Sequence, residues 1–138
     1  MRRLLQIIAV LTWVEGASDD MPEAAVYRVQ DAEGRGPFRP GLSAQWSDRE
    51  GDARPAPYFD LWPDWRRLVP GGWWYGSAVE RLEQLDLWFT PAERQRLAGL
   101  GFHLAALDRA FIAARDPAQV LIVRRRPFIA CRVLPWPP

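Results

Sequence analysis

The chain contains no lysine, and all 18 of its basic residues are arginine. The phosphate-binding loop of nucleotide hydrolases requires a lysine after its glycines, so the glycine pairs at residues 34–36 and 71–72 are not such loops. A single cysteine, Cys131, excludes an internal disulfide and any zinc site built from several cysteines. A single histidine, His103, excludes a pair of histidine ligands. We therefore expect no metal site and no disulfide.

Charge of one sign is not in excess either, because 18 basic residues face 17 acidic ones. This balance excludes a global field that would attract nucleic acid or an anionic membrane. The 138 residues are 49% hydrophobic, which is too apolar for a disordered chain. A chain of this length forms one domain that buries roughly two-thirds of the surface of the unfolded chain.

Residues 1–20 allow three interpretations. Two arginines and the apolar residues 4–14 resemble a signal peptide, although Glu15 interrupts the cleavage region. Alternatively, translation begins at Met21 and the segment is a spurious extension, or residues 5–10 form a buried strand. A true signal peptide predicts secretion, and a start at Met21 predicts a cytoplasmic protein. The apolar stretch is too short to span a bilayer as a helix, so we expect no membrane partner.

Residues 21–138 predict a single α+β domain with a mixed, mainly antiparallel sheet. Runs of β-branched and apolar residues bounded by turn formers indicate its strands. The predicted strands are residues 26–30, 102–107, 120–123 and 128–134. Because only residues 124–127 separate the last two, these strands predict a hairpin at the end of the chain.

Two capping boxes predict two helices that pack on one side of the sheet. Ser77 precedes Glu80 by three residues, which predicts a helix over residues 78–89. Thr90 stands in the same relation to Glu93, with a proline at the first helical position, and predicts a helix over residues 91–99.

Residues 31–76 are rich in proline, glycine and aspartate, and only residues 60–68 leave room for a helix. The many aromatic residues of this segment predict an ordered loop region that lines a cleft. Its tryptophans either thicken a small core or form a binding surface, since Trp, Tyr and Arg dominate interface hot spots. Aspartates among the aromatics disfavour binding of single-stranded nucleic acid.

Two further groups invite a chemical interpretation. Cys131 and His103 could form a thiolate–imidazole pair, but Cys131 alternates with Ile129 and Val133 on a predicted core face. An inert buried cysteine is therefore the favoured interpretation. The arginines at residues 124–126 could grip phosphates, but three charges without basic neighbours favour a solvated turn.

Two short motifs and a late glutamine resemble ADP-ribosyltransferases of the Arg-Ser-Glu type. Residues 26–29, Val-Tyr-Arg-Val, resemble the opening strand, in which an aromatic–Arg pair begins the NAD site. Residues 74–77, Trp-Tyr-Gly-Ser, are similar to the aromatic-x-Ser element of that fold. The third element is a Glu, or a Gln in degenerate members, at the start of a late strand, where this chain has Gln119.

The resemblance implies an ADP-ribosyltransferase-like fold and NAD as a substrate, with no metal. It implies that Arg28 pairs with the pyrophosphate and that Ser77 bonds the nicotinamide ribose. An aromatic residue would flank the nicotinamide ring, the candidates being Tyr27, Trp74 and Tyr75. Gln119 is the candidate catalytic residue and would orient a ribose hydroxyl. It lacks negative charge, and no Glu follows Glu93, so we expect slow transfer or none, a loss on the order of a hundredfold or more.

A short, lysine-free chain of this fold also resembles small phage or prophage accessory proteins, including anti-CRISPR inhibitors. This resemblance implies an alternative function, binding of a host protein without catalysis. Whether the chain is an enzyme, and its oligomeric state, stay open at this point. The distinguishing feature is whether four tryptophans are buried or form one exposed patch, namely Trp62, Trp65, Trp73 and Trp74.

Overall fold

The computed structural model of the chain describes residues 25–48 and 54–136. The predictions for residues 1–20 lie outside the described residues. The strands are β1 (Ala25–Gln30), β2 (Trp74–Ala78), β3 (His103–Asp108), β4 (Ile112–Arg115), β5 (Val120–Arg124) and β6 (Cys131–Leu134). Within the described ranges, the α-helices are α2 (Tyr58–Leu61) and α3 (Pro91–Gly99), and the 3-10 helices are η1 (Ser43–Gln45), η2 (Trp65–Leu68), η3 (Leu82–Leu87) and η4 (Arg109–Phe111). The α+β class is confirmed.

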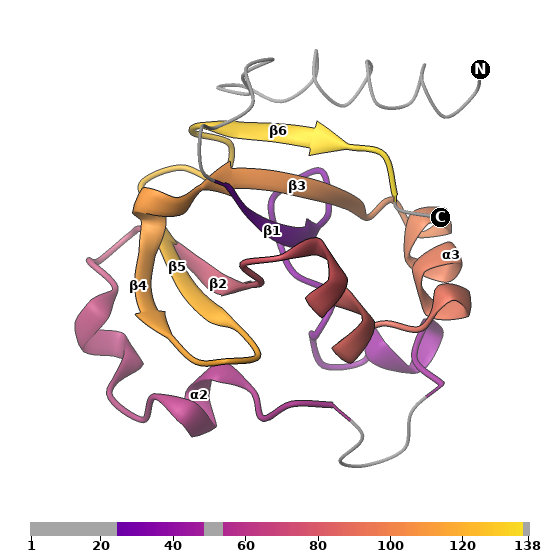
Figure 1. The fold of residues 1–138 in the computed structure, drawn as a ribbon, viewed down its shortest axis with the longest axis horizontal. Coiled ribbons are helices and arrows are strands. Elements are labelled where there is room, and N and C mark those ends of the chain that lie inside the picture. The colour runs from indigo at the N-terminus through magenta and orange to yellow at the C-terminus, as the bar shows by residue number, and fades with distance from the viewer. Residues whose placement is uncertain (1–24, 49–53, 137–138) are drawn as a thin grey trace.

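The strands divide between two three-stranded sheets, ordered β1-β3-β6 and β2-β5-β4. The sequence predicted one mixed, mainly antiparallel sheet, whereas these residues form two sheets in which every pairing is antiparallel. Figure 1 shows the first sheet across the top of the molecule and the second below it at an angle. One isolated bridge, Tyr27 to Val79, connects β1 to the chain just after β2, with both N–H···O distances at 2.8 Å. The two sheets therefore meet at this bridge and separate beyond it.

The predicted hairpin at the end of the chain is wrong, because β5 and β6 belong to different sheets. β5 lies between β2 and β4, so both of its edges are occupied, whereas β6 pairs with β3. Arg124 is buried and donates to the carbonyl of Pro127 and to Oε1 of Gln30, which holds the chain where it crosses between the sheets. The hairpin lies instead between β4 and β5, where Asp116 and Gln119 exchange backbone hydrogen bonds.

The helix predicted over residues 78–89 is also wrong. Ser77 lies in β2 opposite Leu121 of β5, so its backbone is extended and its hydroxyl caps no helix. The chain bends after β2 and forms only the short η3. Gln84 supplies the cap there, since its Oε1 accepts from the backbone N–H groups of Glu80 and Arg81.

The second predicted helix is confirmed as α3. Its capping box is formed on both sides, because Glu93 N donates to Thr90 Oγ1 at 3.1 Å and Thr90 N donates to Glu93 Oε1 at 2.9 Å. Leu97 of this helix is fully buried. The capping residues and the apolar face thus act as the sequence indicated.

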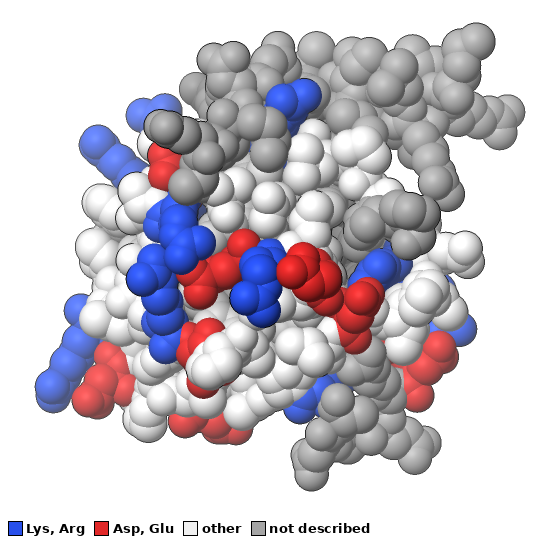
Figure 2. Space-filling model, in the orientation of Figure 1, with Lys and Arg blue, Asp and Glu red and all other residues white. Residues whose placement is uncertain are grey.

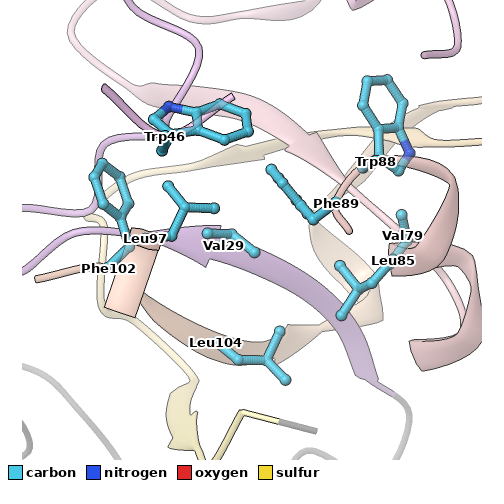
Figure 3. Close-up of a cluster of buried hydrophobic side chains, with 9 residues drawn as sticks. All are labelled: Val29, Trp46, Val79, Leu85, Trp88, Phe89, Leu97, Phe102 and Leu104. Carbon is cyan, nitrogen blue, oxygen red and sulfur yellow. The ribbon is translucent and has the colours of Figure 1, made fainter. Parts of the chain in front are cut away.

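Two hydrophobic clusters form the core. One lies between the sheets, with Val26 and Leu107 from the first sheet and Ile122 from the second. The other packs η3 and α3 onto β1 and β3, and Figure 3 shows Trp46 beside Leu97 at one end and Trp88 beside Phe89 at the other. The tryptophans of the loop region do not form one exposed patch. Trp46 is fully buried, Trp73 is 41% exposed, and Trp62, Trp65 and Trp74 are half-buried.

Candidate functional site

A partly open pocket of about 930 Å³ lies where β1 and β2 separate. Residues 27–29 and 75–79 form one side of it. The opposite side comes from the loop region, with residues 36–40 and 54–60, and from Leu85, Trp88 and Phe89. The predicted cleft lined by the loop region therefore exists.

Arg28 lies inside the opening between the two strands. Its Nη1 donates to the carbonyl oxygen of Ser77 at 2.8 Å, and its Nη2 donates to the carbonyl oxygen of Gly34 at 3.5 Å. The residue is buried, with 7% of its surface exposed. Val79 directs its backbone N–H and C=O at β1, so Ser77, two residues away, faces the same side. Since β1 has diverged at that point, the guanidinium of Arg28 satisfies a carbonyl that further strand pairing would have satisfied.

Glycine makes room for this guanidinium. A Cβ at Gly76 would lie 2.4 Å from Nη1 of Arg28, and one at Gly36 would lie 3.2 Å from Nη2. Without side chains at these positions, the strand and the loop approach the guanidinium closely. Two residues of the Trp-Tyr-Gly-Ser motif thus position Arg28: Gly76 leaves space for its guanidinium, and the carbonyl of Ser77 accepts its hydrogen bond.

The charge of Arg28 is uncompensated among the described residues, because none of their carboxylates lies within ion-pair distance of it. The carboxylate with the largest electrostatic effect on Arg28 is Asp31, which forms an ion pair with Arg39 at 3.3 Å. Burial lowers the pKa of Arg28 to about 10, and Asp31 opposes that shift, so the side chain stays charged at neutral pH. Its Nε has no partner among the described residues. A buried cation without an ion-pair partner favours the binding of an anion beside it in the pocket.

Ser77 and Gln119 lie side by side, although 42 residues separate them in the chain. Ser77 Oγ donates to Gln119 Oε1 at 2.8 Å, and Gln119 Nε2 donates to the carbonyl of Ala56. Gln119 directly precedes β5 and is 1% exposed. Ser77 lines the pocket, whereas Gln119 lies behind it.

The three predicted aromatic candidates differ in position. Tyr27 and Tyr75 line the pocket, and Trp74 does not. Successive strand residues point to opposite faces, so Trp74 cannot share the face of Tyr75 and Ser77. The structure thus brings together Tyr27, Arg28, Tyr75, Ser77 and, behind them, Gln119.

The sequence analysis missed Tyr58, which also lines the pocket. Burial raises the pKa of its hydroxyl, and a hydrogen bond with Tyr75 acts in the same direction, while Arg28 opposes the shift. Its ring packs edge-on against Tyr75 and Trp65, with centroids 6.0 and 5.3 Å away. Its only sequence signal is the abundance of aromatics in residues 31–76, which indicates a cleft but no particular side chain.

The other candidate groups are structural. Cys131 is buried, burial raises the pKa of its thiol to about 11, and it lies opposite Leu107 of β3. His103 stands at the other end of that strand, opposite Gln30, so the inert cysteine is the interpretation that the geometry supports. The solvated turn predicted for residues 124–126 is wrong for Arg124, which is buried, and right for the two exposed arginines after it.

Acidic and basic side chains are interspersed over the face seen in Figure 2. In residues 25–48 and 54–136, no group of three His, Cys, Asp or Glu side chains could hold a metal ion. The same residues include no helix with the length and apolar character needed to cross a membrane.

Comparison with protein families matches residues 21–123 to the family described as Bacteriophage T4 Y00F protein. The match covers more than half of the 138 residues and includes Arg28, Ser77 and Gln119. Neither the curated proteins nor the solved structures gave a match. The resemblance to phage proteins is thereby supported, and that to ADP-ribosyltransferases stays a prediction. The chain belongs to the bacteriophage T4 Y00F protein family.

Proposed function

We propose that this phage-family protein binds NAD in the pocket between β1 and β2, with the pyrophosphate held by Arg28. The observation that carries the proposal is the uncompensated guanidinium of Arg28 in the pocket wall. Arginine forms charge-assisted hydrogen bonds with phosphate oxygens, and Arg28 belongs to the pocket lining. An anion there would offset the cost of burying the charge.

The neighbouring residues fit the rest of the molecule. A volume of about 930 Å³ lies within the range of small-molecule pockets, roughly 300–1,000 Å³. Ser77 offers a hydroxyl oxygen beside Arg28 for a ribose hydroxyl. Tyr27 and Tyr75 offer aromatic surface for the nicotinamide ring, as the resemblance implies.

The chain's own residues support binding better than catalysis. NAD, when bound, would supply an ADP-ribose group for transfer, and the residues named above would hold and orient it. Gln119 is neutral, so it cannot stabilise developing positive charge as a carboxylate would. We therefore propose that any transfer to a host protein is slow and that binding is the main property of the site.

Isothermal titration calorimetry with four ligands tests the proposal. We expect binding of NAD, weaker binding of ADP and of inorganic pyrophosphate, and none of nicotinamide alone. Added salt should weaken the binding of all three anions, since their contact with Arg28 is electrostatic. Absence of heat with millimolar NAD and pyrophosphate would overturn the proposal. Equal affinity for nicotinamide and for NAD would contradict the role of Arg28.

A specific observation favours the second candidate function, binding of a host protein without catalysis. Three aromatic side chains of the pocket wall are exposed, with Phe38 at 50%, Phe59 at 52% and Tyr75 at 39%. Exposed aromatics grouped at one opening are typical of interaction sites. A photo-crosslinking phenylalanine analogue at position 59 should then capture a host protein, while the same analogue at the exposed Leu100 should not. Equal labelling from both positions would contradict this function.

A further inference from the structure

We infer that Gln119 is a positioning residue that fixes the hydroxyl of Ser77 and one wall of the pocket at the same time. The inference deepens the proposed function and rests on it for the ligand. Both ends of the Gln119 amide are engaged, Oε1 with Ser77 and Nε2 with Ala56. The side chain is 1% exposed and lies outside the pocket lining, so it acts on a ligand through these two partners.

The direction of the amide follows from its partners. The carbonyl of Ala56 can only accept a hydrogen bond, so the NH₂ end of Gln119 must face it. The oxygen end then faces Ser77, and the Ser77 hydroxyl must donate to it. The proton of Ser77 is therefore directed away from the pocket.

Ser77 consequently presents lone pairs to the ligand. Its carbonyl oxygen is already engaged by Arg28, which leaves the hydroxyl oxygen as an acceptor beside a cation. A ligand that fits this pair carries a hydrogen-bond donor next to an anion, as a ribose hydroxyl stands next to a phosphate. By fixing the direction of the Ser77 hydroxyl, Gln119 thus determines that the pocket favours a ligand with a hydrogen-bond donor at this point.

The second bond of Gln119 fixes the wall segment, residues 54–57. Ala56 stands between Pro55 and Pro57, which have no N–H groups of their own, and the segment leads directly into Tyr58. Tyr58 lines the pocket close enough to Arg28 for the two to interact electrostatically. Through its bond to Ala56, Gln119 therefore positions Tyr58 near Arg28, the residue that donates to the carbonyl of Ser77.

This geometry requires an amide at position 119. A carboxylate would place an unprotonated oxygen against the carbonyl of Ala56, where both atoms are acceptors. A protonated carboxyl group would restore the second bond. The variant Gln119→Glu should therefore behave like the parent at low pH and lose the connection as the carboxyl group ionises.

The test compares the parent, Gln119→Glu and the control Gln95→Glu, which makes the same change at an exposed position of α3. The affinity for NAD is measured by calorimetry at pH 5 and pH 8. We expect Gln119→Glu to bind like the parent at pH 5 and on the order of tenfold more weakly at pH 8, the size of effect expected for one lost buried bond. Gln119→Met, which lacks both bonds, should bind weakly at both pH values.

Hydrogen exchange provides a readout without ligand. At pH 8, amides of residues 58–61 should exchange faster in Gln119→Glu than in the parent, while those of α3 should not change. Unchanged exchange and unchanged NAD affinity at pH 8 would overturn the inference. If the parent fails to bind NAD, the exchange experiment still decides the positioning role, so the two failures are distinguishable. If Gln119→Glu fails to fold at pH 8, the exchange of Gln119→Met decides it.

Discussion

Gly76 determines whether the guanidinium of Arg28 can occupy the space between the two sheets. A methyl group at Gly76 would collide with Nη1, Nη2 and Cζ of Arg28, all within 2.7 Å. Because these atoms end a flexible side chain, Arg28 would move aside rather than unfold the strand. We expect Gly76→Ala to abolish NAD binding in calorimetry while lowering the free energy of unfolding by only about 1–3 kcal/mol.

The matched control is Gly71→Ala. A Cβ at Gly71 would meet nothing within 4 Å, and its backbone does not require glycine. This variant should bind NAD like the parent. NAD binding by Gly76→Ala at parental affinity would show that the position of Arg28 is irrelevant to the ligand.

His103 makes the folded state sensitive to acid. It is 7% exposed, neither ring nitrogen has a partner among the described residues, and burial lowers its pKa from 6.5 to about 4. The unfolded chain binds a proton at His103 more readily than the folded chain does, so acid favours unfolding. The free energy of unfolding therefore keeps its full value above pH 6.5 and decreases as the pH falls towards 4. The loss approaches about 3 kcal/mol.

Urea unfolding at several pH values checks this, with His103→Leu as the comparison. The difference in unfolding free energy between parent and variant should change between pH 7 and pH 4 in favour of the variant. A difference that stays constant with pH would contradict a neutral buried histidine.

The sequence indicated several residues that the structure brings together, such as Arg28 and Ser77, but not their environment. Alternation along a strand puts Arg28 and Val29 on opposite faces of β1. In the structure both residues are buried, because core clusters lie on both faces of β1, with Val29 in one and Val26, on the face of Arg28, in the other. Two segments enclose Arg28: the irregular turn of residues 31–36, and β2, which lies more than 40 residues further along the chain. No local sequence pattern shows that either segment packs on Arg28.

Among the elements, α3 depends most directly on its first residue. Thr90 accepts from the backbone N–H of Glu93, a bond that an alanine could not replace. Thr90→Ala should lower the free energy of unfolding by about 1 kcal/mol in urea titrations. Thr90→Ser keeps the hydroxyl group, so its loss should be much smaller. Equal losses in both variants would indicate that the methyl group, not the hydroxyl, matters.

The two capping patterns explain which elements sequence reasoning can predict. Thr90 to Glu93 and Ser77 to Glu80 have the same form, yet only the first caps a helix. Residues 74–78 pair along their whole length with β5, more than 40 residues away, and that pairing outweighs a local cap. β1, β3 and β5 were predictable because apolar and β-branched residues make up most of each strand. The partner of each strand was not, since register depends on contacts between distant segments.

At the scale of the whole molecule, the two sheets form one cooperative unit. In the described part of the chain they share a single bridge. The cluster between them contains Val26 and Leu107 from one sheet and Val120 and Ile122 from the other. Disrupting either sheet exposes apolar surface of both. We expect far-UV circular dichroism and tryptophan fluorescence to report one coincident thermal transition. Two separated transitions would contradict a shared core.

The pocket at the junction of the sheets gives this molecule its proposed function, and Arg28 is the residue on which that function depends. Arg28→Ala removes a buried cation that has no ion-pair partner among the described residues, and it leaves the carbonyl of Ser77 unsatisfied. These effects oppose each other. We therefore expect a change in unfolding free energy of no more than about 2 kcal/mol, less than the roughly 3–5 kcal/mol of a broken buried ion pair.

The most direct measurement is NAD binding by calorimetry in the parent and in Arg28→Ala, paired with the melting temperature of each. We predict that the parent binds NAD, that Arg28→Ala does not, and that the two proteins melt within a few degrees of each other. The exposed Arg125, changed to alanine, should bind like the parent. A large drop in melting temperature for Arg28→Ala, together with a parent that does not bind NAD, would contradict the account and leave Arg28 a purely structural residue.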